Sequence, residues 1–189
     1  VPAATLKEFI AHAKANPGKL NFASQGNGSL SHVGTALLEQ TTGIDMLHVP
    51  YKGTAPALTD LIAGRIQVMF SSLPSVQPHV QAGRVKLLAT GARTRTDAIR
   101  DVPTIGESIP GYELGTWYGM FAPRRTPAPV IERLHAALVT ILKSPEIAQA
   151  FAAQGVEPAW TTPRELETYI KSETERWRKV IQTAGIKIE

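Results

Sequence analysis

The chain has 189 residues, of which 43% are hydrophobic, enough for the core of one domain or of a domain with part of another. It contains no cysteine, which excludes disulfides, thiolate catalysis and zinc–thiolate sites. The formal net charge is +4, but lysines and arginines are scattered among acidic residues. We therefore expect a mild preference for anions and no nucleic-acid interface.

No uninterrupted apolar run approaches the ~20 residues that a membrane-spanning helix needs. No signal peptide precedes the first predicted helix, so we expect a soluble chain whose export signal lies outside this sequence. The five histidines are widely separated, and no carboxylate cluster accompanies them. We therefore expect no metal site and no other cofactor.

Helix and strand patterns alternate along the first half of the chain. The patterns predict helices over 5–16, 30–41, 56–63 and 75–82, and strands over 20–24, 46–49, 66–70 and 85–90. A capping box at Thr5 and Glu8 marks the first helix start. Alternation at this spacing implies βαβ units and a mostly parallel sheet, whose ligand lies outside the carboxyl ends of the strands.

The second half has a different character. We expect one or two strands over 112–122, followed by three amphipathic helices. The first helix is capped by Thr126 with Pro127 at its first position, the second runs from Ser144 to Gly155, and the third has a capping box at Thr162 and Glu165 and ends before Gly185. These helices need an apolar partner, so we expect them to belong to a second sheet whose other strands are missing from this chain.

A polar, glycine-rich segment joins the first predicted strand to the next helix. It comprises Ser24, Gln25, Gly26, Asn27, Gly28 and Ser29, and is called the 24–29 loop below. Exposed amides, hydroxyls and the positive end of a helix make such a segment a natural carboxylate or phosphate site. The alternative is a plain tight turn capped by Ser29. The loop lacks the glycines and lysine of nucleotide-binding motifs, which disfavours nucleotide binding.

Other candidate ligand residues follow the predicted strands. They are Lys52, Gly53, Ser71 and Ser72, and His32 is a further candidate one turn into the helix after the 24–29 loop. For each, an ordinary structural role is the alternative: a histidine satisfied by hydrogen bonds, a solvated lysine, or a serine-rich strand exit. No nucleophile motif surrounds Ser29 and no acidic partner is evident for His32, which disfavours a hydrolase.

Several motifs resemble the receptors of the tripartite tricarboxylate transporter family, also called TctC or Bug. They are residues 6–9 and 13–24, the 24–29 loop with His32, residues 48–53 with 56–60 and Gly64, residues 101–104 with Glu107, and residues 110–112 and 117–119. The motifs occur in the family's order and cover nearly the whole chain.

The resemblance implies an α/β, periplasmic-binding-protein-like fold of type II, in which two lobes close like a flytrap. Residues 1–111 would form the second lobe, and residues 112–189 a hinge strand with C-terminal helices of an incomplete first lobe. The chain would be a periplasmic receptor that delivers a di- or tricarboxylate, or a related organic acid, to membrane transporter subunits. The 24–29 loop would hold one end of that ligand.

Two departures from the family pattern carry expectations of their own. The N-terminal part of the first lobe is absent, so we expect exposed apolar faces on residues 127–142 and 163–184, and self-association that covers them. Many relatives carry an acid near the exit of the third strand, where this chain has Ser71 and Ser72. The missing acid favours a simple organic acid over an amino acid.

Two other function classes stay open at this point. An effector domain of a transcription regulator, or a partner of a two-component sensor, uses a similar two-lobed plan, although no helix-turn-helix is visible. An enzyme on an α/β sheet would need an acid–base pair or an activated nucleophile at the strand exits. The predicted loops offer serines and amides but no such pair, so we expect no enzyme.

Overall fold

The computed structural model describes residues 1–96, 99–152, 154 and 156–187. The chain divides into two compact units, one of Val1–Gly115 with Trp177–Glu189 and the other of Thr116–Arg176. The first unit contains a β-sheet with helices, and the second contains helices and extended chain.

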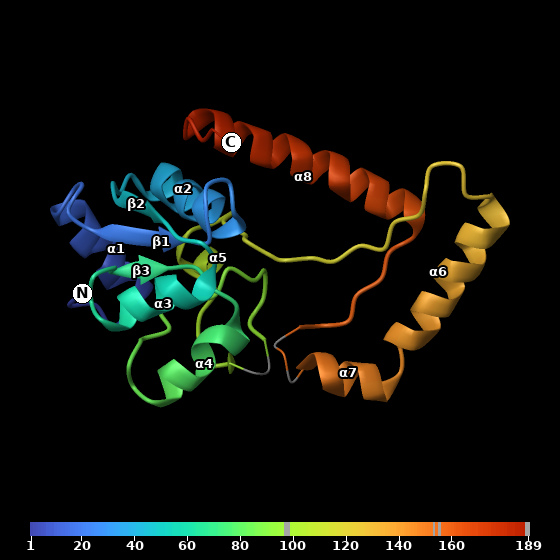
Figure 1. Ribbon diagram of the computed structural model, residues 1–189, viewed down its shortest axis with the longest axis horizontal. Coiled ribbons are helices and arrows are strands. Elements are labelled where there is room, and N and C mark those ends of the chain that lie inside the picture. Colours follow the sequence, from blue (N-terminus) through green and yellow to red (C-terminus); the bar gives the residue numbers. More distant parts are fainter. Residues whose placement is uncertain (97–98, 153, 155, 188–189) are drawn as a thin grey trace. The chain divides into compact units, whose positions relative to one another are not determined.

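The first unit is built on a three-stranded parallel sheet. Its strands are β1 (Asn21–Ser24), β2 (Leu47–Pro50) and β3 (Val68–Met69), and their order is β2-β1-β3 (Figure 1). Its helices are α1 (Leu6–Ala15), α2 (Leu30–Thr42), α3 (Thr54–Ile62), α4 (Leu73–Gln81) and α5 (Ile105–Ser108). The predicted βαβ alternation is confirmed, because α2 connects β1 to β2 and α3 connects β2 to β3.

Successive residues of β1 serve two separate hydrophobic clusters. Phe22 is 2% exposed and packs in the cluster that contains Leu6, Phe9 and Leu38 from α1 and α2. Ala23 is fully buried in the other cluster, with Ala57 of α3. The alternation follows from the period of two in a strand, so Phe22 and Ser24 both face α2 while Ala23 faces α3.

The predicted helix starts and stops are largely confirmed. Thr5 Oγ1 accepts a hydrogen bond from Glu8 N at 3.2 Å, while the Glu8 carboxylate reaches back to Ala4 N instead of Thr5 N. A stop that was not predicted ends α2, where Gly43 adopts a left-handed backbone with φ of 70°. Glycine tolerates this conformation because it has no Cβ, and the helix ends there.

The strand expected over 85–90 is not present. Only an isolated bridge joins Thr90 to Thr104, with Thr90 N donating to Pro103 O at 2.9 Å and Ile105 N donating to Thr90 O at 2.8 Å. Leu88 and Ala89 are instead partly buried against the larger hydrophobic cluster. These apolar residues pack against the core without pairing in a sheet. A periodic hydrophobic pattern alone does not distinguish these two cases.

The strands expected over 112–122 are also absent. The segment's first residues lie on α2, where the Tyr112 hydroxyl donates to Gly34 O at 2.9 Å and a Cβ on Gly34 would lie 2.3 Å from Leu114 Cδ2. Gly34 thus allows a close approach that a larger residue would block. Further on, Tyr118 and Phe121 are exposed and lie in extended chain. In the described part of the chain these residues pair with no strand, so their apolar pattern forms no sheet.

The second unit carries the predicted amphipathic helices. They are α6 (Ala128–Leu142), α7 (Pro145–Ala152) and most of α8 (Pro163–Thr183). The N-cap of α6 is Pro127, not Thr126, because the chain at Thr126 still belongs to a turn in which Thr126 N donates to Pro123 O. The capping box of α8 is confirmed, with Thr162 N donating to Glu165 Oε2 at 2.7 Å and Glu165 N donating to Thr162 Oγ1 at 3.2 Å. Gly155, the expected end of α7, lies outside the described residues.

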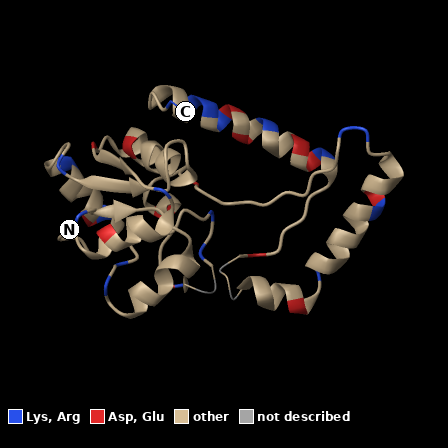
Figure 2. Ribbon diagram, viewed as in Figure 1, with Lys and Arg blue, Asp and Glu red and all other residues tan. Residues whose placement is uncertain are grey.

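The expected exposure of apolar side chains is seen on α6. Val130, Leu134 and Ile141 are 45%, 44% and 51% exposed. Acidic and basic residues alternate along α8 (Figure 2), and its last turns belong to the first unit, where Val180 is buried and Val180 O accepts from Gln40 Nε2 at 3.0 Å. Among the described helices, none is both long and apolar enough to cross a membrane.

Candidate anion-binding site

The carboxyl ends of the three strands lie at one edge of the sheet, because all three run parallel and β1 is central. Hydrogen bonds tie the segments that leave this edge together. Tyr51 N donates to Ser24 O at 3.0 Å, and Gln25 Nε2 donates to Phe70 O at 3.0 Å. The predicted convergence of the 24–29 loop with the exits of β2 and β3 is therefore observed.

Within the 24–29 loop, four backbone amides are already paired inside the protein. Their donors and acceptors are Gln25 N to Ser31 Oγ at 3.1 Å, Gly26 N to Ser24 Oγ at 3.2 Å, Gly28 N to His32 Nδ1 at 3.2 Å, and Ser29 N to Gly26 O at 3.2 Å. We expected successive amides to point into a cavity, and this expectation is wrong for these four. Two of these acceptors, Ser31 Oγ and His32 Nδ1, follow the loop, and the other two, Ser24 Oγ and Gly26 O, belong to it.

Three further amides of the described chain, in the loop and the first residues of α2, have no acceptor, and Ser31, which carries one of them, is buried. Among the described residues, Asn27 N, Leu30 N and Ser31 N donate to no acceptor. Ser29 caps the helix by accepting from His32 N at 3.4 Å, so the capping alternative is also realised. Unpaired amides together with the positive end of a 13-residue helix form an anion-attracting environment.

Ser24 supports the loop from within the protein. The residue is fully buried, and its hydroxyl donates to Gly26 O at 3.0 Å and lies 2.6 Å from His48 Nε2. His48 was not among the predicted site residues. The parallel register that pairs Phe22 with His48 brings it beside the loop, and this register is the signal that points to it.

Two imidazole rings meet beneath the loop. His32 and His48 stack with centroids 3.7 Å apart, and Phe22 stacks on His48 at 4.8 Å and lies 6.1 Å from His32. Burial lowers the pKa of His32. Burial, and then the nearby charge of His32, lower the pKa of His48 to about 4. Both rings are therefore neutral at neutral pH.

The other predicted residues occupy the neighbouring strand exits. Ser71 Oγ is buried without a hydrogen-bond partner among the described residues, whereas Ser72 Oγ lies 2.8 Å from Ser75 Oγ. Lys52 is exposed, and in the described part of the chain its side chain pairs with nothing. Gly53 has a φ of 103° and forms the N-cap of α3. The structure thus places these residues at the expected edge, but joins neither Lys52 nor Ser72 to the 24–29 loop.

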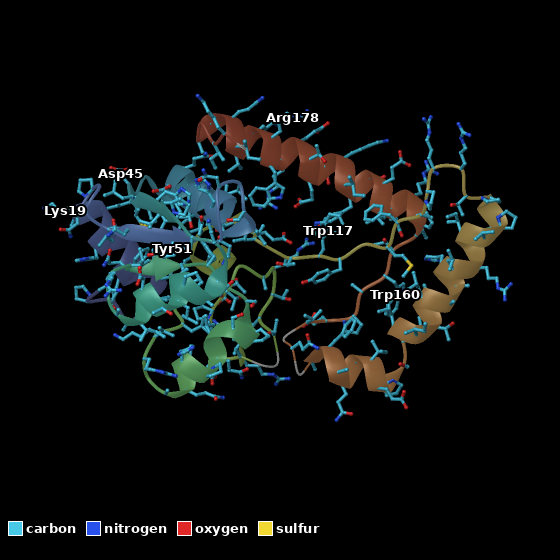
Figure 3. All side chains as sticks on the ribbon, in the orientation of Figure 1. Lys19, Asp45, Tyr51, Trp117, Trp160 and Arg178 are labelled. Carbon is cyan, nitrogen blue, oxygen red and sulfur yellow. The ribbon has the colours of Figure 1, made fainter. Side chains whose placement is uncertain are left out.

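A hydrogen-bonded clamp fixes the segment after β2. Tyr51, labelled in Figure 3, donates from its hydroxyl to Asp60 Oδ2 at 2.7 Å, and Arg65 Nη1 lies 2.8 Å from Asp60 Oδ1. Hydrogen bonds from Tyr51 and then from Arg65 lower the pKa of Asp60. Asp60 therefore stays ionised, and both of its carboxylate oxygens are already bonded within the protein, by Tyr51 and Arg65. Sequence reasoning missed this clamp because its members are nine and five residues apart on different elements.

An open groove of about 630 Å³ lies elsewhere in the first unit. Its lining is Lys7, Ile10, Lys14, Thr41, Thr42, Ser108, Ile109 and Pro110. These residues surround the carboxyl end of α2, the opposite end from the 24–29 loop. Lys7 and Lys14 favour an anion there, whereas carbonyl groups at a helix carboxyl end disfavour one, so the strand exits are kept as the candidate site. No group of three or more potential metal ligands occurs among the described residues.

Comparison with known proteins decides the family. The family model described as "Tripartite tricarboxylate transporter family receptor", TctC, matches residues 1–186. The chain belongs to this receptor family. A curated relative, the "UPF0065 protein in tcbD-tcbE intergenic region" of Pseudomonas sp. strain P51, is 40% identical over 93% of this chain and 53% of its own length. The chain spans about half the length of this relative and of two other similar curated proteins.

Solved structures support the same assignment. The TctC chain resembles "R. palustris Rpa4515 with adipate" with a TM-score of 0.85 and 33% identity, over 98% of this chain and 62% of the other. It also resembles MatC of Rhodopseudomonas palustris "with bound malate", with a TM-score of 0.75 and 31% identity, over 95% of this chain and 63% of the other. The predicted α/β, periplasmic-binding-protein-like fold is confirmed, and the family is one of periplasmic receptors and not of enzymes.

Proposed function

We propose that the protein is the ligand-holding part of a periplasmic receptor that captures a small organic dicarboxylate or related acid. The observation that carries the proposal is the set of three unpaired amides, of Asn27, Leu30 and Ser31, at the amino end of α2. A carboxylate has two acceptor oxygens and needs several donors. The bound adipate and malate of the two similar structures support the choice of ligand class.

The predicted site residues divide into two groups in this proposal. Asn27 and Ser29 face the ligand from the loop, and the exits of β2 and β3 contribute the remainder: Lys52, Gly53, Ser71 and Ser72. His32 acts through the loop, because its Nδ1 accepts from Gly28 N. Ser24, Gln25, Gly26 and Gly28 hold the loop in shape through the internal hydrogen bonds described above. The unpartnered Ser71 hydroxyl supports a ligand contact there, because buried polar atoms in proteins are normally paired.

The composition of the three strand exits narrows the ligand further. The segments 24–29, 50–53 and 70–72 contain one lysine and no aspartate or glutamate. A ligand amino group would be cationic and would need an acidic partner. We therefore propose a simple organic acid in preference to an amino acid.

A ligand titration of the isotope-labelled chain tests this function. Millimolar adipate or malate is expected to shift the amide resonances of Asn27, Leu30 and Ser31, with adipic acid dimethyl ester, which has no charge, as the control. At 100-fold saturation the ligand should also stabilise the fold by about 2.7 kcal/mol in thermal unfolding. Unchanged spectra with both acids, or shifts confined to the groove around Lys7 and Lys14, would overturn the assignment.

We further propose that residues 1–111 form the second lobe of a flytrap and residues 112–189 part of the first. The boundary at Gly115 between the two compact units supports this division, although the last turns of α8 return to the first unit. In the full receptor the ligand is passed to membrane subunits of a tripartite tricarboxylate transporter.

The exposed apolar face of α6 leads to a prediction about association. We expect the chain to show a concentration-dependent mass above that of a monomer in light scattering, because Val130, Leu134 and Ile141 are exposed together on one helix. Leu134→Glu should restore the monomer, whereas Arg133→Glu, a neighbouring exposed position, should not. A monomer at all concentrations would contradict the proposed self-association.

A further inference from the structure

The stacked histidines beneath the 24–29 loop are not explained by ligand binding alone. Their rings come from different elements, His32 from α2 and His48 from β2, and lie with centroids 3.7 Å apart and planes inclined by 23°. Each ring also makes a hydrogen bond to a separate part of the loop. The pair therefore links both ends of the loop through a single contact.

The hydrogen bonds determine which nitrogen of each ring carries a proton. His32 Nδ1 accepts from Gly28 N at 3.2 Å, so neutral His32 carries its proton on Nε2. Ser24 Oγ gives its one proton to Gly26 O, so it accepts from His48 Nε2–H at 2.6 Å. Gly26 N also donates to Ser24 Oγ, which completes a chain of bonds from His48 into the loop.

A second proton on His32 would break this arrangement. It would attach to Nδ1, the atom that accepts from Gly28 N, and leave two donors facing each other. It would also place a positive ring against its stacked neighbour. From β1 the pair contacts Phe22 and Ser24, which carry no charge, and from the loop it contacts the Gly28 amide. No carboxylate in the described residues pairs with either ring to offset the charge.

We propose that His32 and His48 are a positioning pair that holds the 24–29 loop in its ligand-accepting form only while both rings are neutral, so that acidification releases the loop. The effect on affinity rests on the proposed receptor function, whereas the effect on the loop does not. The sign follows from the two lowered pKa values, of which that of His48 falls from 6.5 to about 4. The unfolded chain binds protons first, so the pair's stabilisation is complete above pH 6.5 and is lost as the pH falls through the lowered pKa values of the two rings.

Nuclear magnetic resonance of the unliganded chain tests the loop directly. At neutral pH we expect His32 Nδ1 and His48 Nδ1 to be unprotonated, with the proton of each ring on Nε2. On acidification the Gly26 and Gly28 amide resonances should move together with the two imidazoles, and the imidazoles should titrate below 6.5. Titration of His32 without any change at Gly28 would overturn the proposal.

Variants separate a charge effect from a packing effect. His32→Gln offers an amide oxygen to Gly28 N but takes up no proton, so the acid-induced shift of Gly28 should disappear. His48→Phe keeps an aromatic stack and removes the bond to Ser24, so Gly26 should shift already at neutral pH. His12→Gln, on α1 and away from the loop, is the matched control and should titrate like the unaltered chain.

Affinity for adipate then tests the consequence for binding. The affinity of each variant is divided by the affinity of the same variant at pH 7.5, which removes differences between variants at neutral pH. The protonation of adipate itself affects all variants equally. Below the pKa of the pair, one linked proton should weaken the unaltered chain relative to His32→Gln by about tenfold per pH unit. Identical profiles would overturn the proposal while leaving the receptor function intact. Absence of any binding at pH 7.5 would contradict the receptor function. The resonance titration of the unliganded chain would still test whether protonation of His32 and His48 changes the loop.

Discussion

Replacement of Phe9 by alanine is expected to lower the free energy of unfolding by about 3–5 kcal/mol, a large fraction of the 5–15 kcal/mol typical of a small domain. Phe9 is 1% exposed and joins α1 to the cluster that contains Phe22 and Leu38. The substitution removes the buried ring and leaves a cavity, because a close-packed core relaxes only in part.

Urea unfolding followed by circular dichroism measures this loss. Val130→Ala on α6 is the control, since Val130 is 45% exposed and its truncation should change stability by no more than about 0.5 kcal/mol. If Phe9→Ala cost no more than the control, the larger hydrophobic cluster would not be what stabilises the first unit.

Replacement of Gly28 by alanine is expected to weaken carboxylate binding by about tenfold, equivalent to 1.4 kcal/mol. Gly28 has a φ of 71°, where a Cβ costs about 1–2 kcal/mol. The loop relieves that strain by changing its backbone, which removes the bond from Gly28 N to His32 Nδ1 and moves the neighbouring Asn27 amide. Isothermal titration with adipate measures the change.

Gly43 at the other end of α2 provides a matched control. It has a φ of 70° with nothing within 4 Å of an added Cβ, so Gly43→Ala introduces a similar strain far from the loop. Both variants should lose stability in thermal unfolding, but only Gly28→Ala should lose affinity. Equal affinities for the two variants would show that the conformation of the 24–29 loop does not govern binding.

Local sequence signals predicted the scaffold of the site well. The limits of α1 and α2 follow to within one residue from patterns within a few residues, whereas α3 begins at Thr54, two residues before its expected start. The convergence of the three strand exits follows from the parallel βαβ order. The strands expected over 85–90 and 112–122 do not form, because a strand also requires a neighbour with free hydrogen-bonding groups. A periodic pattern of apolar residues indicates only that their side chains are buried. Leu88, for example, is partly buried but does not belong to a strand.

The details of the site depend on contacts between distant residues. The sequence shows amides in the 24–29 loop but not that Ser31 and His32 pair with two of them. His48 becomes relevant only through the register of β2 with β1, which places it beside Phe22 and Ser24. The amides of the 24–29 loop that remain free thus depend on side chains in the first turn of α2 and on the neighbouring strand β2.

The inward pairing of four amides of the 24–29 loop has an entropic consequence for a ligand. Each residue that must be ordered on binding costs about 1–2 kcal/mol of backbone entropy, and here the protein's own side chains order the loop beforehand. In the proposed receptor, an incoming anion would meet three donors in an already ordered segment and would not have to fold that segment around itself. If the proposed site binds its anion there, the internally paired amides would contribute to the affinity through preorganisation.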